Sequence, residues 1–136
     1  MIRVTTFLAA FLFASAANAQ TEVPNTFQAG QPVEGYGPGF FRIGGQVIEG
    51  AVITGPAGTR TWAGFEDAGT LLELKEQIDV LFIGTGADVA HLPDDLLNPL
   101  QEAGIGVEAM ASPAACRTYN VLLSEGRRVA LALIPV

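Results

Sequence analysis

The chain offers few residues from which a catalytic or metal site could be built. Among 136 residues it holds one cysteine, Cys116, and one histidine, His91. A single cysteine excludes an intrachain disulfide and any zinc site built on several cysteines, and a single histidine excludes motifs that need two. Cys116 could act as a nucleophile only if His91 approached it in the folded chain. We therefore predict no catalytic residue, no metal and no cofactor, with Cys116 serving as a small hydrophobic residue of a helix.

The segment Gly84-Thr85-Gly86 begins like a dinucleotide-binding loop but does not continue as one. Val89 stands where the third glycine of that motif belongs, and the next helix opens with Asp94 and Asp95. Two carboxylates there would repel a pyrophosphate from the helix N-terminus that should hold it. We expect the glycines to let the chain leave a sheet tightly instead.

Polar residues follow the ends of two predicted strands, and parallel strands of an open α/β sheet hold ligands at their carboxyl ends. If a helix joins these strands in the usual parallel crossover, their ends lie side by side. The candidate ligand or partner edge consists of Gly84, Thr85, Gly86, Met110, Ser112, Arg117, Tyr119 and Asn120. Purely structural roles are the favoured alternative: Ser112 caps a helix, Tyr119 packs in the core and Arg117 pairs with an acid. Tyr36 and Trp62 are possible interface anchors, since aromatic residues with a polar edge are enriched at interfaces.

Composition predicts one folded domain without affinity for nucleic acid. Hydrophobic residues make up 49% of the chain and charged residues 15%, which suits a compact core. Seven basic residues stand against 14 acidic ones, a net charge of −7. An acidic chain has no electrostatic reason to seek a phosphate backbone, so we exclude nucleic-acid binding.

The elements are organised around the segment 79–86, a short apolar run closed by glycines. It has no helical period and predicts a strand buried on both faces, as in sheets covered by helices. After it we predict a helix beginning at Pro93 and kinked or split by Pro99, a strand over 106–110, a helix capped by Ser112 and a strand over 129–134. Gly104 and Gly126 are expected to end the two helices. This alternation indicates α/β packing.

The part before residue 79 is predicted to be mostly β-structure. Residues 35–39 indicate a tight turn, and strands over 40–43 and 46–54 form a hairpin around Gly44 and Gly45. A short strand over 59–62 follows. A short helix over 71–77 is predicted, with Thr70 and Glu73 forming a capping box.

The first 19 residues have the three parts of a secretory signal peptide: a basic start with Arg3, an apolar run and Ala17-Asn18-Ala19 before Gln20. The alternative is an uncleaved N-terminal anchor. We assign residues 20–34 to a linker and 35–136 to a single α/β domain, with no membrane-spanning segment beyond the leader. The leader predicts an exported, periplasmic protein.

Several segments together resemble a known family. They are Gly35-Tyr36-Gly37-Pro38-Gly39-Phe40, Trp62, Leu81-Phe82-Ile83-Gly84-Thr85-Gly86, Val107-Glu108-Ala109-Met110, Ala115-Cys116-Arg117-Thr118-Tyr119-Asn120-Val121-Leu122 and Glu125-Gly126-Arg127-Arg128-Val129. This pattern resembles the small domain of unknown function shared by the mitochondrial respiratory complex I assembly factor 3 and many bacterial proteins. The resemblance covers about residues 27–136.

The resemblance implies a three-layer α/β fold around a mixed sheet whose last strand runs antiparallel to its neighbours, whereas the segment pattern alone predicts a parallel one. It also implies a non-enzymatic role, with a respiratory-complex subunit or another assembly factor as protein partner. A factor that helps to build the NADH-oxidising arm of complex I is expected to work in the cytoplasm or at the cytoplasmic face of the inner membrane. This location conflicts with the export that the leader predicts. There are two alternatives. One is a small-molecule-binding domain or minor enzyme that uses the candidate ligand or partner edge, and the other is an exported domain of unrelated role.

Overall fold

The computed structural model describes residues 30–136, and the predicted leader and most of the predicted linker lie outside this range. The described chain forms eight strands in two sheets, with three helices. A five-stranded sheet has the order β5-β4-β8-β6-β7, and a three-stranded sheet has the order β1-β2-β3. Within this range no helix is both long enough and apolar enough to cross a membrane.

The large sheet is mixed, which confirms the predicted fold class. Strand β6 (Val80–Thr85) pairs in parallel with β7 (Gly106–Met110) on one side and with β8 (Val129–Ile134) on the other. The other edge is antiparallel: β4 (Val52–Gly55) pairs with β8 and with β5 (Gly58–Thr61). The resemblance implied that the last strand, β8, runs antiparallel to its neighbours. This is correct for its pairing with β4 and wrong for its pairing with β6. Helix α5 (Ser112–Ser124) returns the chain from the end of β7 to the start of β8, and such a crossover makes β8 parallel to β6.

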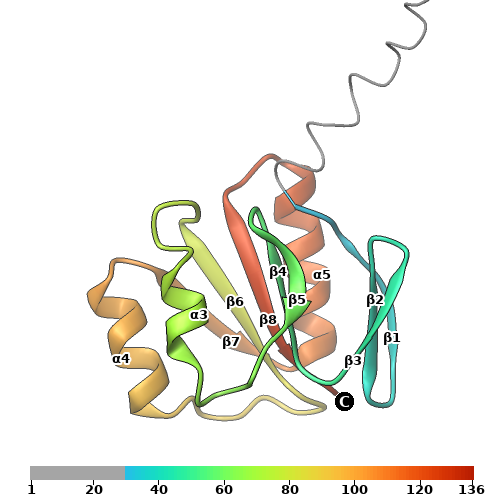
Figure 1. The fold of residues 1–136 in the computed structure, drawn as a ribbon, viewed down its shortest axis with the longest axis horizontal. Helices are drawn as coiled ribbons and strands as arrows, with labels where there is room; N and C mark the ends of the chain where they lie inside the picture. Colours follow the sequence, from blue (N-terminus) through green and yellow to red (C-terminus); the bar gives the residue numbers. More distant parts are fainter. Residues whose placement is uncertain (1–29) are drawn as a thin grey trace, which may run out of the picture.

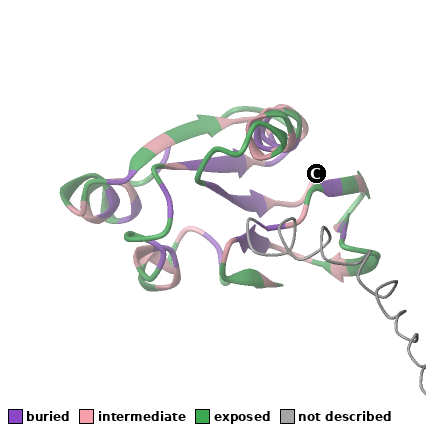
Figure 2. Ribbon diagram, turned by 90° about the horizontal axis from the view of Figure 1, so that it is seen from above, coloured by how far each residue is buried: buried purple, intermediate pink, exposed green. Residues whose placement is uncertain are grey.

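Three layers follow from the alternation of side chains along the central strands. Leu81 and Ile83 of β6 face one apolar cluster, together with helices α3 (Ala68–Leu72) and α4 (Asp94–Glu102). Phe82 faces the opposite cluster, with α5 (Ser112–Ser124) and the small sheet. The central strands thus lie buried between two covers, as Figures 1 and 2 show. The prediction that the segment 79–86 is buried on both faces is confirmed in β6.

The small sheet contains the predicted hairpin and one strand that we missed. Strands β2 (Phe40–Ile43) and β3 (Gln46–Glu49) flank Gly44 and Gly45, both with positive φ, as the tightest hairpin turns require. The prediction of one strand over 46–54 is wrong, because the chain turns at Gly50, with φ of 85°, and passes from the small sheet into the large one. Strand β1 (Val33–Gly37) occupies most of the predicted turn and begins inside the predicted linker.

The predicted starts of α3 and α5 are also wrong. Helix α3 begins at Ala68 and is capped by Asp67, whose carboxylate accepts from the Thr70 N–H at 3.0 Å; the predicted box of Thr70 and Glu73 does not form. After Leu72 the chain continues in turns rather than in helix, although Leu74 and Ile78 are buried as predicted. In α5 the cap position is Ala111, and Ser112 is already helical.

Helix α4 runs unbroken through Pro99, so the predicted split does not occur. Pro93 is its cap residue rather than its first helical residue. Pro99 lies in the second turn and has no N–H to donate to the carbonyl of Asp95, four residues earlier. Asp95 is exposed to water, so this loss falls on the solvent side of the helix. Gly104 and Gly126 follow the ends of α4 and α5 with positive φ, as predicted.

Candidate functional site

The structure brings together the strand ends that the sequence placed side by side. Gly84 of β6 lies opposite Met110 of β7, and the chain enters α5 directly afterwards. At this point the side chain of Ser112 is fully buried. Its hydroxyl accepts from the Gly86 N–H at 2.9 Å and donates to the Ile134 carbonyl at 2.6 Å. The hydroxyl that we assigned to a helix cap therefore links the ends of β6 and β8 to the start of α5.

Close packing explains the two glycines here. A Cβ on Gly84 would lie 2.6 Å from the Ser112 hydroxyl and 2.8 Å from its Cα, so only glycine lets α5 begin directly on β6. Gly86 has a φ of 102°, at which the chain leaves the strand. Both roles agree with the interpretation of a tight exit from the sheet.

Thr85 is also engaged within the protein. Its hydroxyl accepts from the Ala90 N–H at 2.9 Å and lies 2.7 Å from the Asp88 carbonyl, to which it donates. It thereby closes the loop that follows β6. The described polar side chains at this edge hold backbone segments together, and ligand binding there stays a prediction.

The remaining polar residues of the predicted set lie on α5 beside β1 and the residues just before it, rather than at the strand ends. The Tyr119 hydroxyl donates to the Gln31 carbonyl at 3.0 Å, and burial raises the pKa of this phenol to about 12. The Asn120 amide donates to the Val33 carbonyl and accepts from the Val33 N–H, both at 2.9 Å. Arg117, the neighbour of these contacts on α5, is exposed and makes no ion pair within residues 30–136.

Cys116 and His91 lie on different sides of the large sheet. Cys116 is buried in the cluster under α5, and desolvation raises the pKa of its thiol to about 11. His91 is exposed and precedes Leu92, which belongs to the cluster on the opposite face. The two side chains cannot form a nucleophile and base pair across the sheet, and Cys116 packs as a small hydrophobic residue.

A groove lies between α5 and β1. Its volume is about 310 Å³, and we call it the α5/β1 groove; its lining residues are Val33, Glu34, Gly35, Tyr36, Pro113, Cys116, Arg117 and Asn120. Tyr36 is 46% exposed at its rim, and Val121 on the next turn of α5 is 55% exposed. Arg117 also borders a shallow surface hollow next to Val121. This part of the molecule therefore combines exposed apolar area with the Arg117 guanidinium, which pairs with no carboxylate of residues 30–136.

Of the two predicted interface anchors, only Tyr36 is exposed. Trp62 has 5% exposure, and its indole N–H donates to the Asp67 carbonyl at 3.0 Å. It packs in the core under α3. An anchor must be able to reach a partner, so burial argues against this role for Trp62, and the role of Tyr36 stays a prediction.

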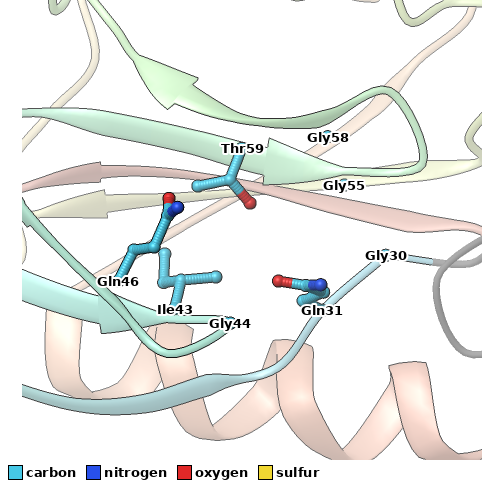
Figure 3. A pocket seen from close by; sticks show the side chains of 8 residues that line it. All are labelled: Gly30, Gln31, Ile43, Gly44, Gln46, Gly55, Gly58 and Thr59. Carbon is cyan, nitrogen blue, oxygen red and sulfur yellow. The ribbon is translucent and has the colours of Figure 1, made fainter.

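A second hollow, of about 270 Å³, opens between the turns of the two sheets (Figure 3). Its lining side chains are neutral: Gln31, Gln46 and Thr59 reach into it beside Ile43 and four glycines. Thr59 already shares a hydrogen bond of 2.7 Å with Thr54. None of the described residues that line the hollow carries a titratable side chain, and none of them is a predicted site residue.

Sequence reasoning missed the strand wall of the α5/β1 groove, because β1 holds two glycines and was taken for a turn. The usable signal was that Val33 and Tyr36 precede Pro38-Gly39, a pair typical of a type II β-turn.

Comparison with known proteins identifies relatives over almost all of the described fold. The model of a protein family of unknown function, DUF498/DUF598, matches residues 33–134. An uncharacterized protein of Rhodobacter capsulatus is 47% identical over 110 residues, which are 81% of this chain and 89% of that protein. NADH dehydrogenase (ubiquinone) 1 alpha subcomplex assembly factor 3 of Danio rerio is 36% identical over 114 residues, or 79% of this chain. The match spans 66% of that assembly factor, just under two thirds of its length.

Solved structures of bacterial proteins share the fold. A structure described as an outer membrane protein from Bartonella henselae has a TM-score of 0.72 and 38% identity, covering 79% of this chain and 97% of that one. A Bordetella pertussis protein, described as a Mth938-like domain, has a TM-score of 0.66 and 26% identity, covering 98% of this chain and 92% of that one.

Proposed function

This chain belongs to the DUF498/DUF598 family, and from that membership we propose that it is a non-enzymatic protein-binding domain that assists the assembly of a respiratory NADH dehydrogenase. The observation that carries the proposal is the 36% identity to an NADH dehydrogenase assembly factor over 79% of the chain. An assembly factor acts by holding another protein, so its surface rather than a reaction centre is the functional feature.

The geometry supports a binding role in two ways. The polar side chains nearest to a ligand edge, Ser112 and Thr85, are committed to internal hydrogen bonds. Exposed apolar residues and an exposed arginine instead gather along α5 and β1, where Tyr36, Arg117 and Val121 lie. Aromatic and arginine side chains are the types enriched at protein interfaces.

The test is cross-linking and affinity purification of the tagged full chain from membranes of the organism that encodes it. We expect subunits of the NADH-oxidising complex to be enriched, by mass spectrometry, over a purification with an untagged chain. Deleting the gene should lower the NADH dehydrogenase activity of the membranes, because incomplete complexes accumulate. Absence of every such subunit, together with unchanged activity after deletion, would contradict the proposal.

A role in the cell envelope is the second candidate. It rests on the leader-like residues 1–19 and on the 38% identity to a structure described as an outer membrane protein. For this candidate we propose export to the periplasm, and for the assembly role a place in the cytoplasm or at the cytoplasmic face of the inner membrane.

N-terminal sequencing of the chain after cell fractionation separates the two candidates. A periplasmic chain that begins at Gln20 favours the envelope role and excludes assembly on the cytoplasmic side. An intact chain in the cytoplasm or at the inner membrane favours assembly.

A further inference from the structure

We propose that the α5/β1 groove binds an extended peptide segment with an acidic side chain, which adds as a strand beside β1. The inference rests on the proposed function, because it names the part of a partner protein that the domain would hold. Edge-strand addition next to a helix is an established way to recognise peptides, in which backbone hydrogen bonds give affinity and neighbouring side chains give selectivity.

Strand β1 is an edge strand in the part of the chain that the structure describes. It lies at the end of the sheet order β1-β2-β3, so among residues 30–136 only its β2 side is paired with another strand. Residues 38 and 39 form the turn to β2, with Gly37 opposite Phe40 and Tyr36 opposite Phe41. Because pairs alternate in an antiparallel ladder and Gly37–Phe40 closes the two-residue turn, the N–H and C=O of Tyr36 point away from β2. They are available for a further strand.

Asn120 already makes the contact that an added strand would make. Its side-chain amide both donates to and accepts from Val33 on the outer side of β1, at 2.9 Å each. Two such hydrogen bonds to one residue are the pairing that a neighbouring strand provides. The amide occupies the start of the edge at Val33, and the edge beyond it, at Tyr36, is left for a ligand.

Helix α5 supplies the second wall. Pro113, Cys116, Arg117 and Asn120 follow one another at the spacing of a single helix face and line the groove opposite β1. Cys116 is buried between the walls and gives an apolar floor. The groove thus runs along β1 between a strand edge and a helix, which is the shape that an extended peptide requires.

The positive charge of Arg117 favours an acidic side chain on the bound peptide. Arg117 is exposed, lines the groove and makes no ion pair within residues 30–136. Glu34 also lines the groove, but its carboxylate accepts from the Gly45 N–H at 3.0 Å and so is held at the β2–β3 turn. A carboxylate of the peptide would pair with the Arg117 guanidinium, the geometry that arginine recognises best.

The experiment selects random peptides displayed on phage against the purified full chain. An enriched peptide is then synthesised with a fluorophore, and its affinity is measured by anisotropy. We expect enriched sequences to contain an acidic residue, and Arg117→Glu to weaken binding about tenfold or more, because it replaces attraction by repulsion. Arg127→Glu is the matched control: Arg127 is exposed in the turn after α5, outside the groove, and affinity should not change.

Backbone addition needs its own readout. When the peptide is added, the Tyr36 amide should exchange with solvent more slowly by NMR, and methylating peptide backbone nitrogens should abolish binding. Failure to enrich any acidic peptide, equal binding by Arg117→Glu and wild type, or an unchanged Tyr36 amide would each overturn the groove proposal.

The two proposals fail in distinguishable ways. If the Arg117→Glu chain still recovers NADH dehydrogenase subunits from membranes as the wild type does, the groove proposal fails and the assembly role stands. If the wild type binds the peptide but recovers no such subunit, the assembly role fails and the groove proposal stands.

Discussion

The hydroxyl of Ser112 joins three segments that lie far apart in the sequence. It accepts from the Gly86 N–H and donates to the Ile134 carbonyl, and it is carried by the first residue of α5. No water can replace these bonds easily, because the residue is fully buried. The role is structural, and it fixes where β6, β8 and α5 meet.

Ser112→Ala should therefore lower the free energy of unfolding by about 2 kcal/mol or more, since it leaves a buried N–H and a carbonyl without partners. Urea denaturation followed by circular dichroism measures the change. Ser124→Ala is the control on the same helix, because its hydroxyl is exposed and donates to the Val121 carbonyl within the same helix. A loss for Ser112→Ala no larger than that of the control would contradict this role.

Burial of two weak acids predicts sensitivity to alkaline pH. Folding raises the pKa of Cys116 from 9.0 to about 11 and that of Tyr119 from 10.0 to about 12. The unfolded chain loses these protons first, so it gains stability relative to the folded chain as pH rises. We expect the free energy of unfolding to fall between about pH 9 and pH 12 by at most roughly 3 kcal/mol for each group. Chemical denaturation at successive pH values tests this, and Cys116→Ala should flatten the fall that begins near pH 9.

Among the elements, those with buried apolar runs were predictable and those set by single turns were not. Strands β6 and β8 agree with the sequence analysis, because their apolar runs are continuous and are followed by glycine or proline. Strand β7, which has no buried residue, and α5 apart from its first residue also agree, and glycine or proline marks the start of each. The division of residues 46–54 depends on Gly50 alone, and β1 is rich in glycine, so neither leaves a periodic signal. The candidate site shows the same limit: Arg117 and Tyr36 were named, but the groove between them requires β1.

Helix α3 shows how neighbouring polar residues compete for one cap. Asp67 precedes Thr70 and takes the cap, accepting from the Thr70 N–H at 3.0 Å and from its hydroxyl at 2.7 Å. These hydrogen bonds lower the pKa of the Asp67 carboxyl below 3.8. Its contribution to stability is therefore present above pH 3.8 and is lost as pH falls through the lowered value.

Asp67→Ala should cost about 1 kcal/mol of stability near neutral pH, the usual effect of removing a helix cap. Asp67→Asn keeps an acceptor and should retain most of that stability, but without the pH dependence below 3.8. Thermal denaturation at neutral and acidic pH measures both. Equal stability of Asp67→Ala and wild type at neutral pH would show that the cap contributes nothing.

At the scale of the whole molecule, the two sheets form separate hydrogen-bonded units that share one apolar cluster. Phe41 and Ile43 of the small sheet pack with Tyr119 of α5 and with β8 residues in that cluster. Hydrogen bonds from Tyr119 and Asn120 to the chain around β1 add directed contacts to this packing. Sequence patterns could indicate each unit, but not their docking, because it depends on contacts 87 and 88 residues apart.

This arrangement predicts that the small sheet can open without unfolding the large one. Asn120→Ala removes both hydrogen bonds to Val33, so amides of β1 and β2 should exchange about tenfold faster, whereas those of β6 and β8 should be unchanged. Asn98→Ala, an exposed change on α4, should alter neither set. Hydrogen exchange resolved by NMR measures both. If all four strands accelerate together, the sheets unfold as one unit, and a ligand seated on β1 would stabilise the whole domain rather than the small sheet alone.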